Sequence, residues 1–220
     1  MIDDGGIAAQ FTPINALSAR FDRLWIARAI NSFPVPVSPR IRTVESEGAT
    51  FAIGLSTLLS ACVDPSVAGL VYVAAHMPDS GEKESEDGKR FPSDLAKSGA
   101  IKKTPDGFTY IDPVQFHEFF AADLPADQAA FMARSQVLNV ADNFSATITT
   151  AAWRTKPSWM VVAGSDRTIN PDLERWYAKR AKSQTVEVAG ASHSVYVSHP
   201  KEVADVIESA ARALSPGKAK

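Results

Sequence analysis

Cysteine is almost absent from this chain, since Cys62 is the single cysteine among 220 residues. One cysteine forms no disulfide within the chain, so the composition favours a reducing compartment, and we expect a cytoplasmic protein. Cys62 lies among apolar residues and is interpreted as an inert core thiol rather than a nucleophile. No apolar run reaches the roughly 18 residues of a membrane span. The acidic start of the chain also lacks the basic and apolar regions of a secretory signal.

A surplus of charge of either sign is lacking as well. The net charge is −2 and there is no basic block, which argues against binding to nucleic acid or to an anionic membrane surface. Apolar residues make up 45% of the chain and charged residues 22%, so its length suffices for one domain with a full core. Metal-ligand spacing is also missing, because the four histidines are too scattered for a zinc site: His76, His117, His193 and His199.

Two strand-like runs near the C-terminal end carry the clearest functional pattern. Residues 159–163 run into a loop with Asp166, and residues 185–188 run into a loop with His193. A helix-like segment at about residues 171–182 lies between them, so the order predicts a strand–helix–strand unit of a parallel sheet. Ligands and chemistry gather at the carboxyl ends of such strands. An acid and a histidine at neighbouring strand ends are two parts of an oriented general base.

The first half of the chain is harder to interpret. Residues 21–30 have apolar side chains at helical spacing and predict a helix, whereas the prolines of residues 33–39 predict an extended loop. Residues 49–62 form an apolar run that predicts a buried helix. Residues 67–75 are apolar on both faces and predict an interior parallel strand.

Residues 79–152 are expected to form a largely helical insertion between two strands of the sheet, placed as a cap or lid over the site. Charged residues 82–104 predict a mobile surface segment, and residues 108–111 a short strand or hairpin arm. Helices are expected from Asp112-Pro113 and from Pro125 to Gln136, with another over residues 140–150. One aromatic group is expected to form the core of this cap, with some members as a pocket wall: Phe116, Phe119, Phe120, Phe131 and Trp153. Beyond His193, Pro200 opens the last helix.

The run of strand, Gly-x-Asp-Arg, helix, strand and Gly-Ala-Ser-His resembles the C-terminal half of an α/β-hydrolase. The likeness is to the esterase and hydroxynitrile-lyase-like branch with a helical cap, and it extends from about Asp64 to Ala213. It implies an α/β-hydrolase-type parallel sheet, with residues 1–63 as an atypical or incomplete N-terminal segment and residues 64–220 as the core. It also implies that Asp166 is the acid of a catalytic triad and His193 its base.

The nucleophile of that family is not found. The family places a serine in Gly-x-Ser-x-Gly on a sharp turn after a strand, and this chain has no such motif. By the resemblance, Ala52 occupies the position of the serine and Gly54 one of the glycines; Ser46 and Ser56 are nearby alternatives without flanking glycines. Three explanations are open: a truncated or mistranslated relative, a relative that lost its nucleophile and now only binds, or an enzyme with an unrecognised nucleophile.

The resemblance implies a hydrolase for carboxylic esters or a related small molecule, with no metal or organic cofactor. The alternative is a catalytically inactive relative that acts as a small-molecule binding or interaction protein. Because an incomplete sheet would expose the edge of the strand at residues 67–75, we also expect poor solubility or pairing into a homodimer. His76 follows that strand and is interpreted as a hydrogen-bonded loop histidine or a pocket residue, and His199 as a helix cap.

Overall fold

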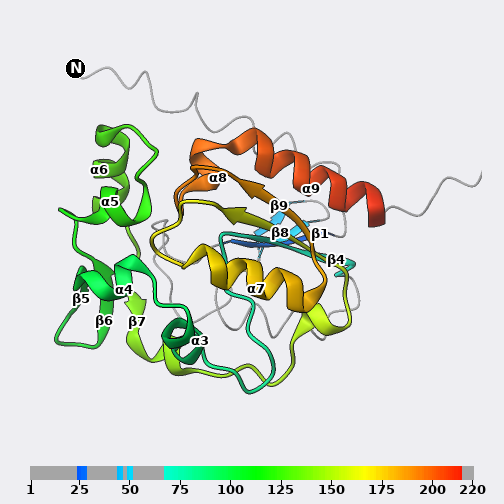
Figure 1. Ribbon diagram of the computed structural model, residues 1–220, viewed down its shortest axis with the longest axis horizontal. Helices are drawn as coiled ribbons and strands as arrows, with labels where there is room; N and C mark the ends of the chain where they lie inside the picture. Colours follow the sequence, from blue (N-terminus) through cyan, green and yellow to red (C-terminus); the bar gives the residue numbers. More distant parts are fainter. Residues whose placement is uncertain (1–23, 29–43, 47–48, 52–66, 215–220) are drawn as a thin grey trace, which may run out of the picture.

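The computed structural model describes residues 24–28, 44–46, 49–51 and 67–214, and its centre is a parallel sheet covered by helices (Figure 1). The sheet contains β1 (Leu24–Arg28), β4 (Gly69–Val73), β8 (Ser158–Ala163) and β9 (Gln184–Val188), in the order β1-β4-β8-β9. Each neighbouring pair is parallel. The predictions of strands at 67–75, 159–163 and 185–188 are thereby confirmed.

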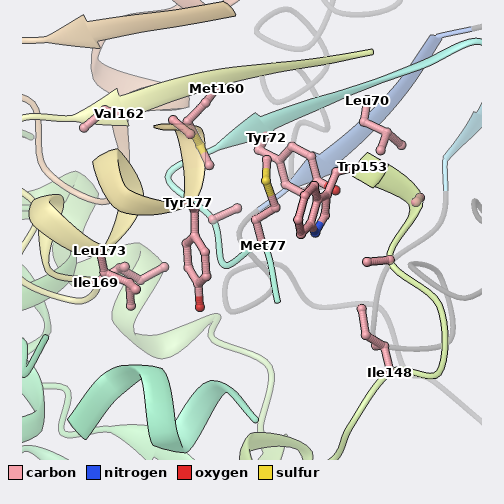
Figure 2. Close-up of a cluster of buried hydrophobic side chains, with 14 of the residues drawn as sticks. Leu70, Tyr72, Met77, Ile148, Trp153, Met160, Val162, Ile169, Leu173 and Tyr177 are labelled. Carbon is pink, nitrogen blue, oxygen red and sulfur yellow. The ribbon is translucent and has the colours of Figure 1, made fainter. Parts of the chain in front are cut away.

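The two faces of the sheet are packed by different helices because side chains alternate along each strand. Leu70, Tyr72 and Met160 face α7 (Pro171–Ala181), where Leu173 and Tyr177 complete one buried cluster (Figure 2). The alternate strand residues, among them Val71 and Val161, pack with Val203, Val206 and Ala210 of α9 (Pro200–Leu214). The central strands β4 and β8 are thus buried on both faces, as the apolar runs in the sequence predicted.

Helix α7 forms where the local sequence favours it. The Asn170 side chain accepts a hydrogen bond from the backbone N–H of Asp172 at 2.9 Å, and Pro171 occupies the first turn. The helix ends at Lys182, which has a left-handed backbone with φ of 54°. These signals set the first and last residues of α7, between β8 and β9.

The helix predicted over residues 21–30 is wrong, because residues 24–28 form strand β1. This strand pairs in parallel with β4 along its whole length, from Leu24 opposite Gly69 to Arg28 opposite Val73. Pairing in a sheet satisfies the backbone groups of the segment, and this tertiary gain outweighs a weak helical spacing. The β4 edge that we expected to be exposed is therefore covered by β1, which removes the reason given for poor solubility or pairing of two copies.

The apolar run at 49–62 also begins differently from the prediction. Residues 49–51 form β3 (Ala49–Phe51), which pairs with β2 (Val44–Ser46) as an antiparallel hairpin rather than starting a helix. The remainder of that run, together with the loop predicted at 33–39, lies outside the described residues.

The insertion, residues 79–152, contains helices and a small sheet, so the prediction of a largely helical segment is only partly right. Its elements are α3 (Glu84–Arg90), α4 (Asp94–Ser98), β5 (Ile101–Lys103), β6 (Phe108–Ile111), α5 (Phe116–Phe120), α6 (Ala126–Arg134), β7 (Asn139–Val140) and the 3-10 helix η2 (Ala141–Ser145). Strands β5, β6 and β7 form an antiparallel sheet. A further 3-10 helix, η3 (Ala152–Arg154), leads back toward β8.

Three local predictions within the insertion need correction. The charged stretch 82–104 is ordered, because long-range contacts such as the hydrogen bond from Tyr177 Oη to Asp87 Oδ2, at 2.7 Å, anchor it. The helix predicted at 140–150 is absent: β7 and η2 occupy its first part, since β7 pairs with β6. The helix expected from Asp112 begins at Phe116, because Asp112 Oδ1 instead accepts from the Val114 N–H in a turn.

The aromatic group that we assigned to the core of the insertion divides into three. Phe116, Phe119 and Phe120 are buried together. Trp153 packs instead in the cluster under α7, and Phe131 is 66% exposed, so the prediction was wrong for these two. Among the residues that the structure describes, no helix has both the length and the apolar character needed to cross a membrane.

Candidate active site

Asp166 lies in the loop that follows β8, and short-range geometry holds its carboxylate in place. Its Oδ1 accepts the backbone N–H groups of Thr168 at 2.7 Å and Ile169 at 3.0 Å. The loop is also tied to the end of the neighbouring strand, since the Ser165 N–H donates to the Ala191 carbonyl at 2.9 Å. Asp166 is 4% exposed. Its second oxygen, Oδ2, is left to accept from a partner on the adjacent loop.

That partner is His193, in the loop that follows β9. The distance from His193 Nδ1 to Asp166 Oδ2 is 2.6 Å, and the imidazole is 2% exposed. Because an ionised carboxylate only accepts hydrogen bonds, Nδ1 is the nitrogen that donates in this contact, and Nε2 points away from Asp166 as the second nitrogen of the ring. The turn that brings His193 to this position includes Gly190, whose φ of 77° favours glycine. The structure therefore brings together the two residues that the sequence singled out.

The end of α5 holds the His193 loop from the side of the insertion. The carbonyl of Phe120 accepts hydrogen bonds from Ser194 N at 3.1 Å, Ser194 Oγ at 2.9 Å and Ser192 Oγ at 3.3 Å. The Phe120 ring also meets the His193 ring edge to face, with 4.6 Å between centroids. Serines on both sides of the histidine are thus fixed by a carbonyl at the C-terminus of a helix, where carbonyls lack partners within the helix.

Asp123, which follows α5, adds a charged group to the same loop. Its carboxylate accepts the Ser192 N–H at 3.1 Å and also bonds to Ser192 Oγ, and His199 Nδ1 lies 3.6 Å from Oδ2. Partial burial raises the pKa of Asp123, but hydrogen bonds from Ser192 and Ser198 outweigh it and hold the pKa below its ordinary value. Asp123 therefore stays ionised while it anchors the loop. His199 lies between α8 (Val195–Ser198) and α9, in line with its interpretation as a structural histidine.

The Asp166 loop is bound to the insertion by a second set of contacts. Arg167 forms ion pairs with Asp94 and Glu118, each with a nitrogen–oxygen distance of 2.9 Å. The Thr168 hydroxyl donates to the Phe119 carbonyl at 2.8 Å. Consecutive carbonyls of α5, from Phe119 and Phe120, therefore bind the acid loop and the histidine loop, so α5 sets the position of one loop relative to the other.

A third ionisable residue, Glu174 of α7, lies beside the acid and was missed in the sequence. Its side chain is fully buried and Oε2 accepts the Ala163 N–H at 3.1 Å. Burial and the negative charge of Asp166 raise the pKa of Glu174 well above its ordinary value. A signal was available, because Glu174 falls on the same helical face as Leu173 and Tyr177, an apolar and an aromatic side chain of the kind that faces a core.

His76 lies in the loop after β4 and contacts Tyr177. Its Nδ1 lies 3.4 Å from the hydroxyl of Tyr177, which donates to the buried Asp87. Burial and the neighbouring Asp87 carboxylate raise the pKa of Tyr177, so the phenol stays protonated. The interpretation of His76 as a hydrogen-bonded loop histidine fits this contact, and a role in a pocket stays a prediction.

The nucleophile candidates are not placed by the structure beside His193. Ser46 is the last residue of β2, and Ala52, Gly54 and Ser56 lie outside the described residues. No group of three or more potential ligands that could hold a metal ion occurs in the part of the chain that the structure describes.

Comparisons with known proteins identify the family and the fold of the chain. A family model described as the alpha/beta hydrolase family matches residues 14–206. No curated protein matches the chain.

Several solved structures have the same fold at low sequence identity. A pyrethroid hydrolase from Sphingobium faniae has a TM-score of 0.57 and 19% identity, with 91% of this chain and 76% of that chain covered. A methylesterase from Arabidopsis has a TM-score of 0.58 and 12% identity, with 91% and 74% covered. Tomato methylketone synthase I, complexed with 2-tridecanone, has a TM-score of 0.60 and 12% identity, with 87% and 71% covered.

Proposed function

This chain belongs to the alpha/beta hydrolase family, and on that premise we propose that it hydrolyses carboxylic esters with His193 as base and Asp166 as the acid that orients it. The observation that carries the proposal is the 2.6 Å contact between His193 Nδ1 and Asp166 Oδ2. With Nδ1–H engaged, Nε2 is the nitrogen that takes up a proton, and the nearby carboxylate stabilises the imidazolium that results.

The surroundings of this pair favour the role of a base. Both side chains are almost fully buried, and in a dry environment the interaction between carboxylate and imidazolium is stronger than in water. Asp166 accepts three hydrogen bonds, two of them from backbone N–H groups of its own loop. The pair is therefore held in one geometry before any substrate binds, which is the condition for efficient proton transfer.

In the proposed reaction, Nε2 takes the proton of a hydroxyl group as its oxygen bonds to the ester carbonyl carbon. The bond from that carbon to the alcohol oxygen then breaks, and the imidazolium returns the proton to the departing alkoxide. The hydroxyl group is not assigned, since Gly-x-Ser-x-Gly is absent. Ser46 and Ser56 remain candidates; a serine would keep the acyl group as an ester until a water molecule, deprotonated by the same Nε2, attacks it, releases the carboxylic acid and lets the serine recover its proton. A water molecule that is deprotonated by Nε2 and attacks the substrate directly would yield the acid in one step.

The comparisons support a small, mainly apolar ester as substrate. A methylesterase is among the similar structures, and another was solved with 2-tridecanone, an apolar ligand. We further propose that the insertion acts as a cap over the site, because Phe120 contacts His193 and the buried phenylalanines of α5 extend from that contact.

Hydrolysis of p-nitrophenyl butyrate by the purified full chain tests this function. We expect hydrolysis by the wild type, none above background for His193→Ala, and near wild-type hydrolysis for the control His117→Gln. In the control, an amide replaces the His117 Nε2 group that lies 2.9 Å from the Leu124 carbonyl. Equal hydrolysis by wild type and His193→Ala would refute the assignment of His193 as the base. An inactive wild type would refute the proposed ester-hydrolase activity.

The absent serine motif favours a second candidate, a binding protein that keeps the family site without catalysis. The free energy of unfolding of such a protein rises with the logarithm of one plus the ligand concentration divided by Kd. An inactive chain whose melting temperature rises with added 2-tridecanone would support this candidate. An inactive chain that also shows no shift with this ketone would argue against an apolar ligand of that kind.

A further inference from the structure

Glu174 is a buried carboxyl group for which the proposed mechanism has no use. It extends from α7 with no exposed surface, and its Oε2 accepts one backbone hydrogen bond, from Ala163 N–H at 3.1 Å. Its other oxygen, Oε1, is buried and has no hydrogen-bond donor among the described residues. A buried polar atom without a partner is costly, so the position of this oxygen needs a physical explanation.

The nearest candidate partner is Asp166, because both residues bind the same residue of β8: the Ala163 N–H donates to Glu174 Oε2 at 3.1 Å, and the Ala163 carbonyl accepts the Asp166 N–H at 3.1 Å. Two ionised carboxylates side by side in a dry interior repel each other, so one of them retains a proton. Asp166 accepts three hydrogen bonds, one of them from His193, whereas Glu174 accepts one. The negative charge therefore resides on Asp166 and the proton on Glu174.

The other charged group near Glu174 does not reverse this assignment. Arg175 is adjacent on α7, but its guanidinium is directed to Glu187 and Asp172, at 2.7 Å and 2.6 Å. It lowers the proton affinity of Glu174 less than burial and the charge of Asp166 raise it. A proton on Oε1 would give this oxygen a partner as well, since Oε1–H could donate to Asp166 while Oε2 accepts from Ala163.

We propose that Glu174 is a positioning residue: as a neutral acid it donates a hydrogen bond to Asp166 and so fixes the carboxylate that orients His193. The effect of Glu174 on ester hydrolysis rests on the proposed function, whereas its protonation and its effect on the imidazole do not. Asp166 is then held by backbone N–H groups of its own loop, by His193 from the loop after β9, and by Glu174 from α7. Helix α7 thereby fixes the position of the acid without contact to substrate.

The chain offers a matched pair of variants. In Glu174→Gln the amide oxygen can accept from Ala163 and the amide N–H can donate to Asp166, which reproduces a neutral glutamic acid. In Glu174→Leu the size is similar, but both hydrogen bonds are lost. The proposal predicts that glutamine rescues what leucine loses.

Two measurements on the full-length variants test the proposal without relying on activity. Infrared difference spectroscopy of wild type minus Glu174→Gln at pH 7 is expected to show the C=O stretch of a protonated carboxyl group. In proton NMR, the strongly hydrogen-bonded Nδ1–H of His193, identified by its loss in His193→Ala, is expected to persist in Glu174→Gln and to broaden or vanish in Glu174→Leu. A carboxylate band in place of the carboxylic-acid band overturns the proposal, as does an unchanged Nδ1–H signal in Glu174→Leu.

Kinetics then connect the residue to catalysis. For p-nitrophenyl butyrate we expect kcat of Glu174→Leu to fall by about tenfold or more with little change in KM, and Glu174→Gln to recover most of it. A fall in Glu174→Gln as large as in Glu174→Leu overturns the proposal. If wild type is inactive, the proposed function fails, and the infrared and NMR results still decide the role of Glu174. If Glu174→Leu does not fold, the infrared band and the kcat of Glu174→Gln decide it.

Discussion

Replacing Glu174 with glutamine removes one ionisable group from the interior and keeps the shape of the side chain. The change therefore isolates what the protonation of Glu174 contributes to the free energy of unfolding. Burial, with the Asp166 charge beside it, raises the native pKa of Glu174 well above the ordinary value of 4.5. In the unfolded chain the same group titrates near that ordinary value. Between the two values, the native wild type holds a proton that the unfolded chain has released.

This difference fixes the sign of the pH dependence. Where the native state binds more protons than the unfolded state, the free energy of unfolding falls as pH rises, by at most about 1.4 kcal/mol per pH unit for one group. Below about pH 4.5 the group is protonated in both states, so its contribution is independent of pH. Glutamine does not titrate. The stability of Glu174→Gln relative to wild type should therefore increase as pH rises above 4.5, until the native pKa of Glu174 is passed.

Urea unfolding followed by tryptophan fluorescence at several pH values between 4 and 8 measures this difference. All other titrating groups are shared by the two proteins, so their contributions cancel in the comparison. Parallel curves for wild type and Glu174→Gln would show that Glu174 is ionised in the native state, and the reasoning would be refuted.

Three further substitutions test the packing of the fold and the anchoring of the His193 loop. Gly69→Ala places a methyl group 2.6 Å from Leu214 Cδ1 and 3.2 Å from a backbone oxygen, so urea unfolding should show a loss of about 1–3 kcal/mol. Gly88→Ala in α3 meets nothing within 4 Å and should gain about 0.5–1 kcal/mol; equal effects would contradict the packing. Asp123→Asn removes an acceptor for Ser192 and should cost about 1 kcal/mol at pH 7. The pKa of Asp123 is lowered on folding, so this contribution should fade as pH drops below its ordinary value of 3.8, and an equal cost at pH 3 and pH 7 would contradict it.

Much of the sheet could be predicted because its signals are local. The apolar runs of β4 and β8 are continuous and bounded by loops, and the capping residues of α7 lie next to the helix that they start. The strand–helix–strand order alone placed Asp166 and His193 at adjacent strand ends. Residues close together in the chain therefore carried the prediction of both candidate site residues.

Other parts of the fold depend on partners far away in the sequence. Strand β1 is a strand because β4 pairs with it, and the charged residues near Asp87 are ordered because Tyr177, 90 residues later, binds them. The contact of Phe120 with the His193 loop joins segments more than 70 residues apart. No local pattern signals such contacts, so the spacing of apolar residues favoured a helix in the first case, and the charged composition favoured a mobile segment in the second.

By itself, the sequence determined which residues are available for acid–base chemistry and in what order the strands present them, because these properties follow from residue type and short-range pattern. The tertiary structure alone decided that Asp166 and His193 meet at 2.6 Å and that Glu174 lies buried beside them. The location of the proton and of the charge depends on distance and on exclusion of water, and both arise only when distant segments pack together.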